Sequence, residues 1–123
     1  MTPSSREKLN TCHPSLQALF KAVDLRASIQ VVCGFRNEAD QNKAYADGFS
    51  QVKWPNGKHN KTPSVAVDVV PLIDGRIEWK NEDAFKALSE TVKCCAEESG
   101  IKVRWGGDWK GFVDRPHWEL TEA

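Results

Sequence analysis

A single carboxylate interrupts the most apolar stretch of the chain, and this places the strongest constraint on the fold. Residues 64–70 read SVAVDVV, a β-branched run that predicts a strand. Alternation along a strand puts the valines at 65, 67 and 69 on one face, and Asp68 on the other face with Ala66 and Val70. Burying an aspartate at the centre of such a strand is costly unless the carboxylate is paired or bound to a metal ion. The fold must therefore bring a partner to Asp68.

Two histidines and a second aspartate elsewhere in the chain offer such partners. His59 precedes Asp68 by nine positions in the polar segment GKHNKTP, and Asp114 and His117 lie together in VDRPHWEL. Catalytic zinc sites use three nitrogen or oxygen ligands and leave a fourth position for water. This set therefore suffices for a zinc site with His59, Asp68 and His117 as ligands and Asp114 as a general base.

Two side chains have a chemical role in this hypothesis without binding the metal. Asp114 can take a proton from the attacking water and pass it to the leaving amine. Arg36, which follows the predicted strand and its turn, can stabilise the oxyanion of a tetrahedral intermediate. Ordinary alternatives stay open from spacing alone: loop histidines are commonly surface residues, Asp114 can form a turn, and Arg36 can be a structural ion-pair partner. No HExxH or cysteine-rich zinc motif decides between them.

Charge and hydropathy exclude several partners. Lys and Arg number 17, as do Asp and Glu, so the formal net charge is zero and offers no general attraction to nucleic acid or to anionic membranes. We expect no nucleic-acid partner. No apolar run approaches the roughly 20 residues of a membrane-spanning helix, and the first 20 residues lack the apolar core of a secretory signal. We therefore expect neither membrane insertion nor a signal peptide.

The cysteines are expected to be reduced. Cys12, Cys33, Cys94 and Cys95 form no CxxC pair, and a chain without a secretion signal rarely keeps disulfides. Cys95 falls on the apolar face of a predicted helix. Cys12 beside His13 is interpreted as a small buried side chain next to a helix start, rather than as a metal site.

The predicted elements fit one α+β domain over residues 1–123. Helical periodicity and end signals predict helices over 14–25, 37–47 and 82–99. Apolar runs predict strands over 29–34, 64–70, 101–105 and 117–120, with Pro71 ending the second, a turn at Asp74-Gly75, and an exposed loop over 49–63. Because helices and strands mix without a regular βαβ period, we expect a mostly antiparallel sheet packed with helices.

Four ordered motifs resemble a known family: GFR (34–36), KHN…PSVAVDVVP (58–71), IKVRWGGDW (101–109) and DRPHWEL (114–120). Together they resemble the VanY-type (M15) zinc peptidases, and most closely phage endolysins that are L-alanyl-D-glutamate peptidases. The resemblance runs from about Leu9 to Leu120 and implies a small Hedgehog/DD-peptidase-like α+β domain.

The resemblance also implies a site and a reaction. It implies zinc held by His59, Asp68 and His117, with Asp114 as catalytic base and Arg36 contacting the substrate carbonyl. The implied reaction is hydrolysis of an amide bond in the peptidoglycan stem peptide, with L-Ala–D-Glu as the expected bond. The implied setting is phage lysis: a monomeric enzyme that stays in the host cytoplasm until a separate pore gives it access to the cell wall, with no separate wall-binding domain.

The chain departs from the family pattern S-x-H-x-x-G-x-A-x-D at two places. His59 and Asp68 are nine positions apart where the family has seven, so a loop before the strand must absorb two residues. Gly57 stands where a serine commonly precedes the histidine, so that hydroxyl is missing or comes from Thr62 or Ser64.

Three alternatives remain at this point. The same chemistry fits a D,D-carboxypeptidase or dipeptidase, for which Lys58, Lys61 and Arg115 are candidate partners of a terminal carboxylate. A non-catalytic zinc-containing binding module is the second, and a structural zinc site closed by Asp114 as fourth ligand is the third. For the substrate groove, Trp54, Trp105, Trp109 and Trp118 are candidate walls, with core packing as their alternative.

Overall fold

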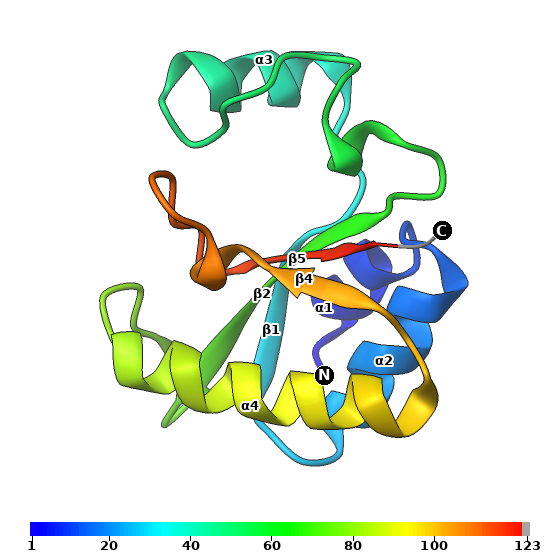
Figure 1. Cartoon of the computed structure of the whole chain (residues 1–123), viewed down its shortest axis with the longest axis vertical. Helices are drawn as coiled ribbons and strands as arrows, with labels where there is room; N and C mark the ends of the chain where they lie inside the picture. Colours follow the sequence, from blue (N-terminus) through cyan, green and yellow to red (C-terminus); the bar gives the residue numbers. More distant parts are fainter. Residues whose placement is uncertain (122–123) are drawn as a thin grey trace.

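An antiparallel sheet forms the centre of the computed structural model, which describes residues 1–121 (Figure 1). The strands are β1 (Ile29–Cys33), β2 (Ala66–Ile73), β3 (Arg76–Ile77), β4 (Val103–Trp105) and β5 (His117–Leu120). They pair in the order β1-β2-β5-β4, and β3 forms a hairpin with β2. The helices are α1 (Pro3–Leu9), α2 (Pro14–Asp24), α3 (Glu38–Ala46) and α4 (Glu82–Ser99), with short 3-10 turns η1 (Lys58–Asn60) and η2 (Gly106–Asp108). The expected α+β class with a mostly antiparallel sheet is confirmed.

The core lies between the sheet and three of the helices. Val67 and Val69 of β2 are fully buried in it, as the alternation of the strand predicts. Helices α2 and α4 contribute the apolar faces expected from their periodicity, including Phe20, whose ring packs edge-on against Trp118 of β5 at 6.4 Å. The fourth helix, α3, lies apart from the others on the far side of the sheet (Figure 1).

The strand register places three chemically active residues in one row. Cys33 of β1 pairs with Asp68 of β2, and Asp68 pairs in turn with His117 of β5. Side chains at paired positions of adjacent strands lie on the same face of the sheet. The sheet therefore fixes the separation of Asp68 and His117 through its backbone ladder.

Helix and strand ends follow their expected signals closely. Asn37 caps α3 by accepting from the backbone N–H of Asp40, and the left-handed Gly100 ends α4. Asp74 and Gly75 both have positive φ, as the tight β2–β3 turn requires. Among residues 1–121 no helix is long and apolar enough to cross a membrane.

Two expectations about the elements were wrong, the end of β2 at Pro71 and the exposed loop over 49–63, which contains η1 and the buried residues Gly57, His59 and Asn60. Two short elements, α1 and β3, were missed. Helix α1 was not predicted, although Thr2 accepts from the Ser5 N–H as N-cap and Pro3 occupies the first helical turn. Pro71 does not end β2, which continues to Ile73. Because the Leu72 N–H donates to Ser28 beside β1, position 71 points its nitrogen away from β1. On that side β2 pairs with β5 only as far as Asp68, and its pairing with β3 starts at Leu72, so no ladder bond is lost at Pro71.

The cysteines occupy the places their surroundings predict. Cys95 is buried on α4, and Cys12 is buried beside His13, the N-cap of α2. All four cysteines are free thiols in the structure. Burial raises the pKa of the Cys12 thiol to about 12, which makes it an unreactive, neutral core side chain.

Candidate active site

Three of the predicted residues converge on one point at the floor of a groove. His59 reaches it from η1, Asp68 from β2 and His117 from the start of β5. His59 Nε2 lies 3.2 Å from Asp68 Oδ1 and 3.3 Å from His117 Nδ1, and the third side of the triangle, His117 Nδ1 to Asp68 Oδ1, is 3.4 Å.

This triangle has the dimensions of one face of a zinc coordination tetrahedron. Zinc bonds of about 2.0–2.1 Å to nitrogen and oxygen hold tetrahedral ligand atoms about 3.3–3.4 Å apart. The three donor atoms therefore fit a single zinc ion without rearrangement. Three ligands would leave the fourth corner of the tetrahedron free for water or substrate.

The nine-residue spacing between His59 and Asp68 is absorbed by a loop held against the N-terminal helices. Ser64 donates its N–H to the Thr11 carbonyl, at 2.9 Å, and accepts from the His13 N–H on its own carbonyl, at 2.8 Å. The residues of the loop between η1 and this anchor, 61–63, are exposed. The extra length therefore bulges outward, and the donor atoms of His59 and Asp68 still meet.

Each imidazole is oriented by a bond on its other nitrogen. His59 Nδ1 donates to the Gly34 carbonyl at 2.8 Å, which leaves Nε2 to face Asp68. His117 Nε2 is 2.8 Å from the buried carboxylate of Glu119, which leaves Nδ1 to face the same point. Such outer partners fix the tautomer of a metal ligand and raise its basicity.

Within residues 1–121, no serine or threonine hydroxyl bonds directly to His59. Thr62 is exposed, and the Ser64 hydroxyl donates to the Ala66 carbonyl at 2.6 Å. Ser64 does not bond to His59 itself, although its hydroxyl lies 3.4 Å from the Gly34 carbonyl that accepts from His59. A side chain at position 57 would meet Asn60, because a Cβ there would lie 2.6 Å from Asn60 Oδ1. The Asn60 amide thus occupies the space beside Gly57.

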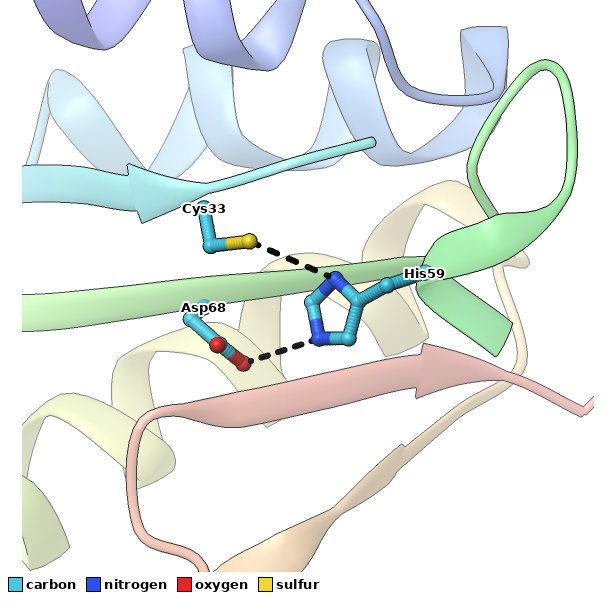
Figure 2. A group of neighbouring side chains, drawn as sticks. All are labelled: Cys33, His59 and Asp68. Carbon is cyan, nitrogen blue, oxygen red and sulfur yellow. Dashed lines mark hydrogen bonds and ion pairs between the residues drawn. The ribbon is translucent and has the colours of Figure 1, made fainter. Parts of the chain in front are cut away.

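Cys33 lies close to the site, but it faces the Nδ1 edge of the His59 ring and not the Nε2 edge that faces Asp68. Figure 2 shows the thiol facing His59 Nδ1, at 3.9 Å, while Asp68 faces Nε2 across the ring. Since Nδ1 already donates to Gly34, the nitrogen that faces Cys33 is not available to a metal ion. The ligand atoms of Cys33, His59 and Asp68 lie within 4.8 Å of one another, a looser group than the triangle with His117, whose sides are 3.2–3.4 Å.

Arg36 is held beside the triangle. Its guanidinium lies 3.3 Å from Asp68 Oδ2, the carboxylate oxygen that faces away from the histidines, and it also donates to Gln41 Oε1 at 3.1 Å. The side chain is 17% exposed and lines the groove. Arg36 is therefore an ion-pair partner, the alternative considered from sequence, and at the same time presents its charge to the groove.

Asp114 stands at the edge of the triangle. One of its carboxylate oxygens lies within 4.8 Å of donor atoms of Asp68 and His117, and within residues 1–121 its side chain has no hydrogen-bond or ion-pair partner. Its backbone is fixed by a bond from its N–H to the Gly106 carbonyl at 3.0 Å. Burial and the nearby Asp68 carboxylate raise the pKa of Asp114 to about 6, which suits a group that must both accept and release a proton near neutrality.

Without metal, the triangle behaves as a charged cluster. Burial disfavours a charged His59, but the Asp68 carboxylate outweighs it and raises the pKa of His59 to about 10. Burial also opposes the charge on Asp68, yet His59 and His117 hold its pKa far below the usual range. A divalent cation at the centre would replace these protons, because zinc ligands must be neutral imidazoles and an ionised carboxylate.

The groove above the triangle encloses about 800 Å³. One wall comes from residues 48–52 and 56–58, after α3, and the opposite wall comes from 109–113, after η2. Exposed apolar side chains stand along both, including Phe49 (74% exposed) and Val113 (44%). The volume is typical of a site for a peptide or a small ligand.

Of the four tryptophans predicted as candidate walls, only Trp109 lines the groove, where its ring lies 4.9 Å from that of His117. Trp105 and Trp118 are stacked in the core at 5.8 Å, and Trp54 packs against Phe35. Trp79, which the sequence did not single out, is 57% exposed and lines the groove. Trp105 and Trp118 are in the core because they pair with each other on the buried face of strands β4 and β5.

Two polar residues of the site were also missed. Glu119 follows His117 by two positions, and strand alternation puts both on one face, so this partner was available from the spacing. Gln41 lies on a helix with no apolar face, and nothing in its surroundings marks it as buried.

Comparisons with known proteins agree on a family. The profile of the phage L-alanyl-D-glutamate peptidase family matches residues 1–121. The L-alanyl-D-glutamate peptidase of Escherichia phage T5 is 33% identical over 113 residues, which cover 90% of this chain and 82% of that protein. The peptidoglycan L-alanyl-D-glutamate endopeptidase CwlK of Bacillus subtilis is 30% identical over 112 residues, covering 81% of this chain and 66% of CwlK.

Solved structures agree with the fold. The crystal structure of the L-Ala D-Glu endopeptidase ChiX of Serratia marcescens superposes with a TM-score of 0.86 at 32% identity, over 98% of this chain and 89% of ChiX. The vancomycin-resistance D,D-dipeptidase VanXYg shares the fold, with a TM-score of 0.51 at 18% identity over 86% of this chain and 47% of that one.

Proposed function

The chain belongs to the phage L-alanyl-D-glutamate peptidase family, and we propose that it is a zinc-dependent endopeptidase that cleaves the L-Ala–D-Glu bond of the peptidoglycan stem peptide. The observation that carries the proposal is the triangle of His59, Asp68 and His117, with sides of 3.2–3.4 Å at the floor of a groove. Peptide hydrolysis is the reaction named for its relatives from phage T5, B. subtilis and S. marcescens.

The donor set suits zinc in number, type and spacing. His59 Nε2, Asp68 Oδ1 and His117 Nδ1 would hold the ion. When bound, zinc polarises a carbonyl oxygen and lowers the pKa of water to about 7. The residues around it then have to position the peptide and handle the proton.

Asp114 is the group placed to handle the proton. Its carboxylate lies beside the triangle without belonging to it and has no other partner within residues 1–121. It would accept the proton of the attacking water and deliver it to the amide nitrogen that leaves with the D-Glu residue.

Arg36 is the group placed to stabilise charge on the scissile carbonyl oxygen. Asp68 and Gln41 hold its guanidinium at the groove, and a guanidinium has further N–H donors to offer. A cation fixed before the reaction begins contributes without reorganising.

The D,D-carboxypeptidase alternative requires a cation that is free to bind a terminal carboxylate. Two of its candidates are already paired: Lys58 with Glu119 at 2.8 Å, and Arg115 with Glu82 at 2.8 Å. Lys61 is exposed and does not line the groove. None of these three candidates is an unpaired cation that lines the groove, and the reaction named for the relatives, cleavage at L-Ala–D-Glu, favours the endopeptidase.

A biological setting follows from the phage relative. We propose that the enzyme is an endolysin, made in the infected host and given access to the wall at lysis.

Digestion of purified peptidoglycan tests the activity and the bond together. Mass analysis of the fragments should find new N-terminal D-Glu in the wild-type digest, none after zinc is removed with a chelator, and recovery when zinc is restored. Free D-alanine as the product would replace this proposal with the carboxypeptidase. Unchanged cleavage in excess chelator would contradict zinc dependence.

A further inference from the structure

Gln41 is a buried amide whose hydrogen-bonding capacity is completely used. The side chain is 1% exposed. Its oxygen accepts from the Arg36 guanidinium and from the Asn60 amide, each at 3.1 Å. Its nitrogen donates to the Val52 carbonyl at 2.7 Å and to the Ser50 hydroxyl at 3.0 Å. Two acceptor and two donor positions are all that a glutamine side chain has.

The two ends of this amide serve different parts of the groove. On the oxygen side, the guanidinium of Arg36 that donates to Gln41 also pairs with Asp68 Oδ2, at 3.3 Å. Gln41 is therefore connected to the ligand triangle through Arg36. On the nitrogen side, Ser50 and Val52 belong to the groove wall, in a segment between α3 and η1 that has no regular secondary structure. One side chain therefore connects the cation of the site to a wall of the groove.

Packing does not account for the burial of Gln41. It is the one buried residue of α3, and the helix has no apolar face that would hold it against the sheet. Buried polar groups in proteins are almost always hydrogen-bonded, since leaving them unpaired is costly. The amide thus contributes specific bonds at this position and little apolar contact.

We propose that Gln41 is a positioning residue, which couples the alignment of Arg36 to the position of the groove wall formed by residues 50–52. The kinetic part of this inference rests on the proposed peptidase function. The structural part, that the wall is held by Gln41, does not.

Two variants distinguish the role of the amide oxygen of Gln41 from that of its nitrogen. Gln41→Glu keeps acceptors for Arg36 and Asn60 but loses both N–H donors and places a carboxylate oxygen against the Val52 carbonyl. Gln41→Leu removes both ends. Gln30→Glu and Gln30→Leu are matched controls, because Gln30 of β1 lies outside the groove and its side chain has no hydrogen-bond partner within residues 1–121.

The measurements are amide hydrogen exchange of residues 48–53 without substrate, zinc content, and kcat and KM on a soluble muramyl-peptide. For Gln41→Glu we expect exchange and KM to rise about 10- to 100-fold, the effect of losing two buried hydrogen bonds, with kcat and zinc content near wild type. For Gln41→Leu we expect the same rise together with a fall in kcat, because Arg36 loses a support.

Ser50→Ala tests the wall independently if a Gln41 variant does not fold. It removes the hydroxyl that accepts from Gln41 and from the Val52 N–H, and leaves Arg36 untouched. Faster exchange of 50–52 and a raised KM at unchanged kcat would support the coupling. Wild-type exchange and KM in Ser50→Ala and in any folded Gln41 variant would overturn it. If the chain cleaved another bond, the proposed function would fail while the exchange result would still decide the role of Gln41.

Discussion

Asp68 and His117 lie opposite each other on neighbouring strands β2 and β5, and their facing donor atoms, Oδ1 and Nδ1, are 3.4 Å apart. Their separation is set by the ladder of the sheet, while η1 brings His59 onto the same point from outside the sheet. Two of the three donors of the triangle are thus held by paired strands of the sheet. Sites built on strands are more precise than sites built on loops.

Replacing His117 should strongly weaken zinc binding. His117→Ala removes one corner of the triangle, and we expect zinc affinity to fall by more than about a hundredfold, beyond the loss typical of an outer partner. His13→Asn is the matched control, because His13 is the remaining histidine and caps α2, a position that asparagine also fills well. Zinc titration of both proteins measures the difference. Equal affinity in the two would exclude His117 as a ligand.

Glu119 should tune zinc affinity through His117. Glu119→Gln weakens the acceptor for His117 Nε2 and loses the charge paired with Lys58. We expect zinc affinity to fall about 10- to 100-fold, as for other outer-shell partners of a ligand histidine. Glu90→Gln, at an exposed position of α4, should leave it unchanged. A wild-type zinc affinity in Glu119→Gln would show that the carboxylate serves only the fold.

The stability of the zinc-free protein should fall as pH rises from 6 to 9. Asp68 raises the pKa of His59 to about 10, above its unfolded value of about 6.5, so this pair stabilises fully below about pH 6.5 and loses its contribution as pH approaches 10. The lowered pKa of Asp68 acts at the other end, where stability is lost as pH falls below about 4.

Thermal unfolding with and without zinc checks this pH dependence. In chelator, Tm should decrease from pH 6 to 9, and the decrease should be smaller in His59→Gln, which lacks the titrating imidazole. Stabilisation by added zinc should grow over the same range, because the metal requires neutral histidines. A zinc-free Tm that rises with pH between 6 and 9 would contradict the ion pair.

Asp114 should be needed for turnover and not for metal binding. In Asp114→Asn we expect kcat to fall about 10²- to 10⁴-fold, the range for loss of a general base, at unchanged zinc content. Asp108→Asn is the control, since Asp108 is exposed, does not line the groove, and within residues 1–121 pairs only with the surface residue Lys93. Undiminished lysis by zinc-loaded Asp114→Asn would require another residue to carry the proton.

Local patterns predicted most of the fold. Strand alternation placed Val67 and Val69 in the core and Asp68 on the opposite face, and cap residues such as Asn37 and Gly100 marked the helix ends. Continuation of β2 through Pro71 was missed because it depends on which neighbours pair at that position, and no local pattern contains that information.

The residues of the site also fall into those that the sequence predicted and those that it did not. His59, Asp68, Asp114, His117 and Arg36 were identified by residue type and by resemblance, and the structure brings them together at one groove. The burial of Gln41 could not be predicted from the sequence, because it comes from contacts with Arg36, Asn60 and the wall at 50–52 that exist only in the folded chain. Trp105, a candidate wall of the groove, is buried in the core, and Trp79, which was not singled out, lines the groove, because burial of a ring depends on the neighbouring strands and loops.

The coordination of zinc in the loaded protein tests the central claim most directly. A crystal structure with anomalous scattering at the zinc edge should show His59 Nε2, Asp68 Oδ1 and His117 Nδ1 at about 2.0–2.1 Å, with a non-protein oxygen in the fourth position. Zinc bound by Asp114 as a fourth protein ligand, or by Cys33, would contradict the account.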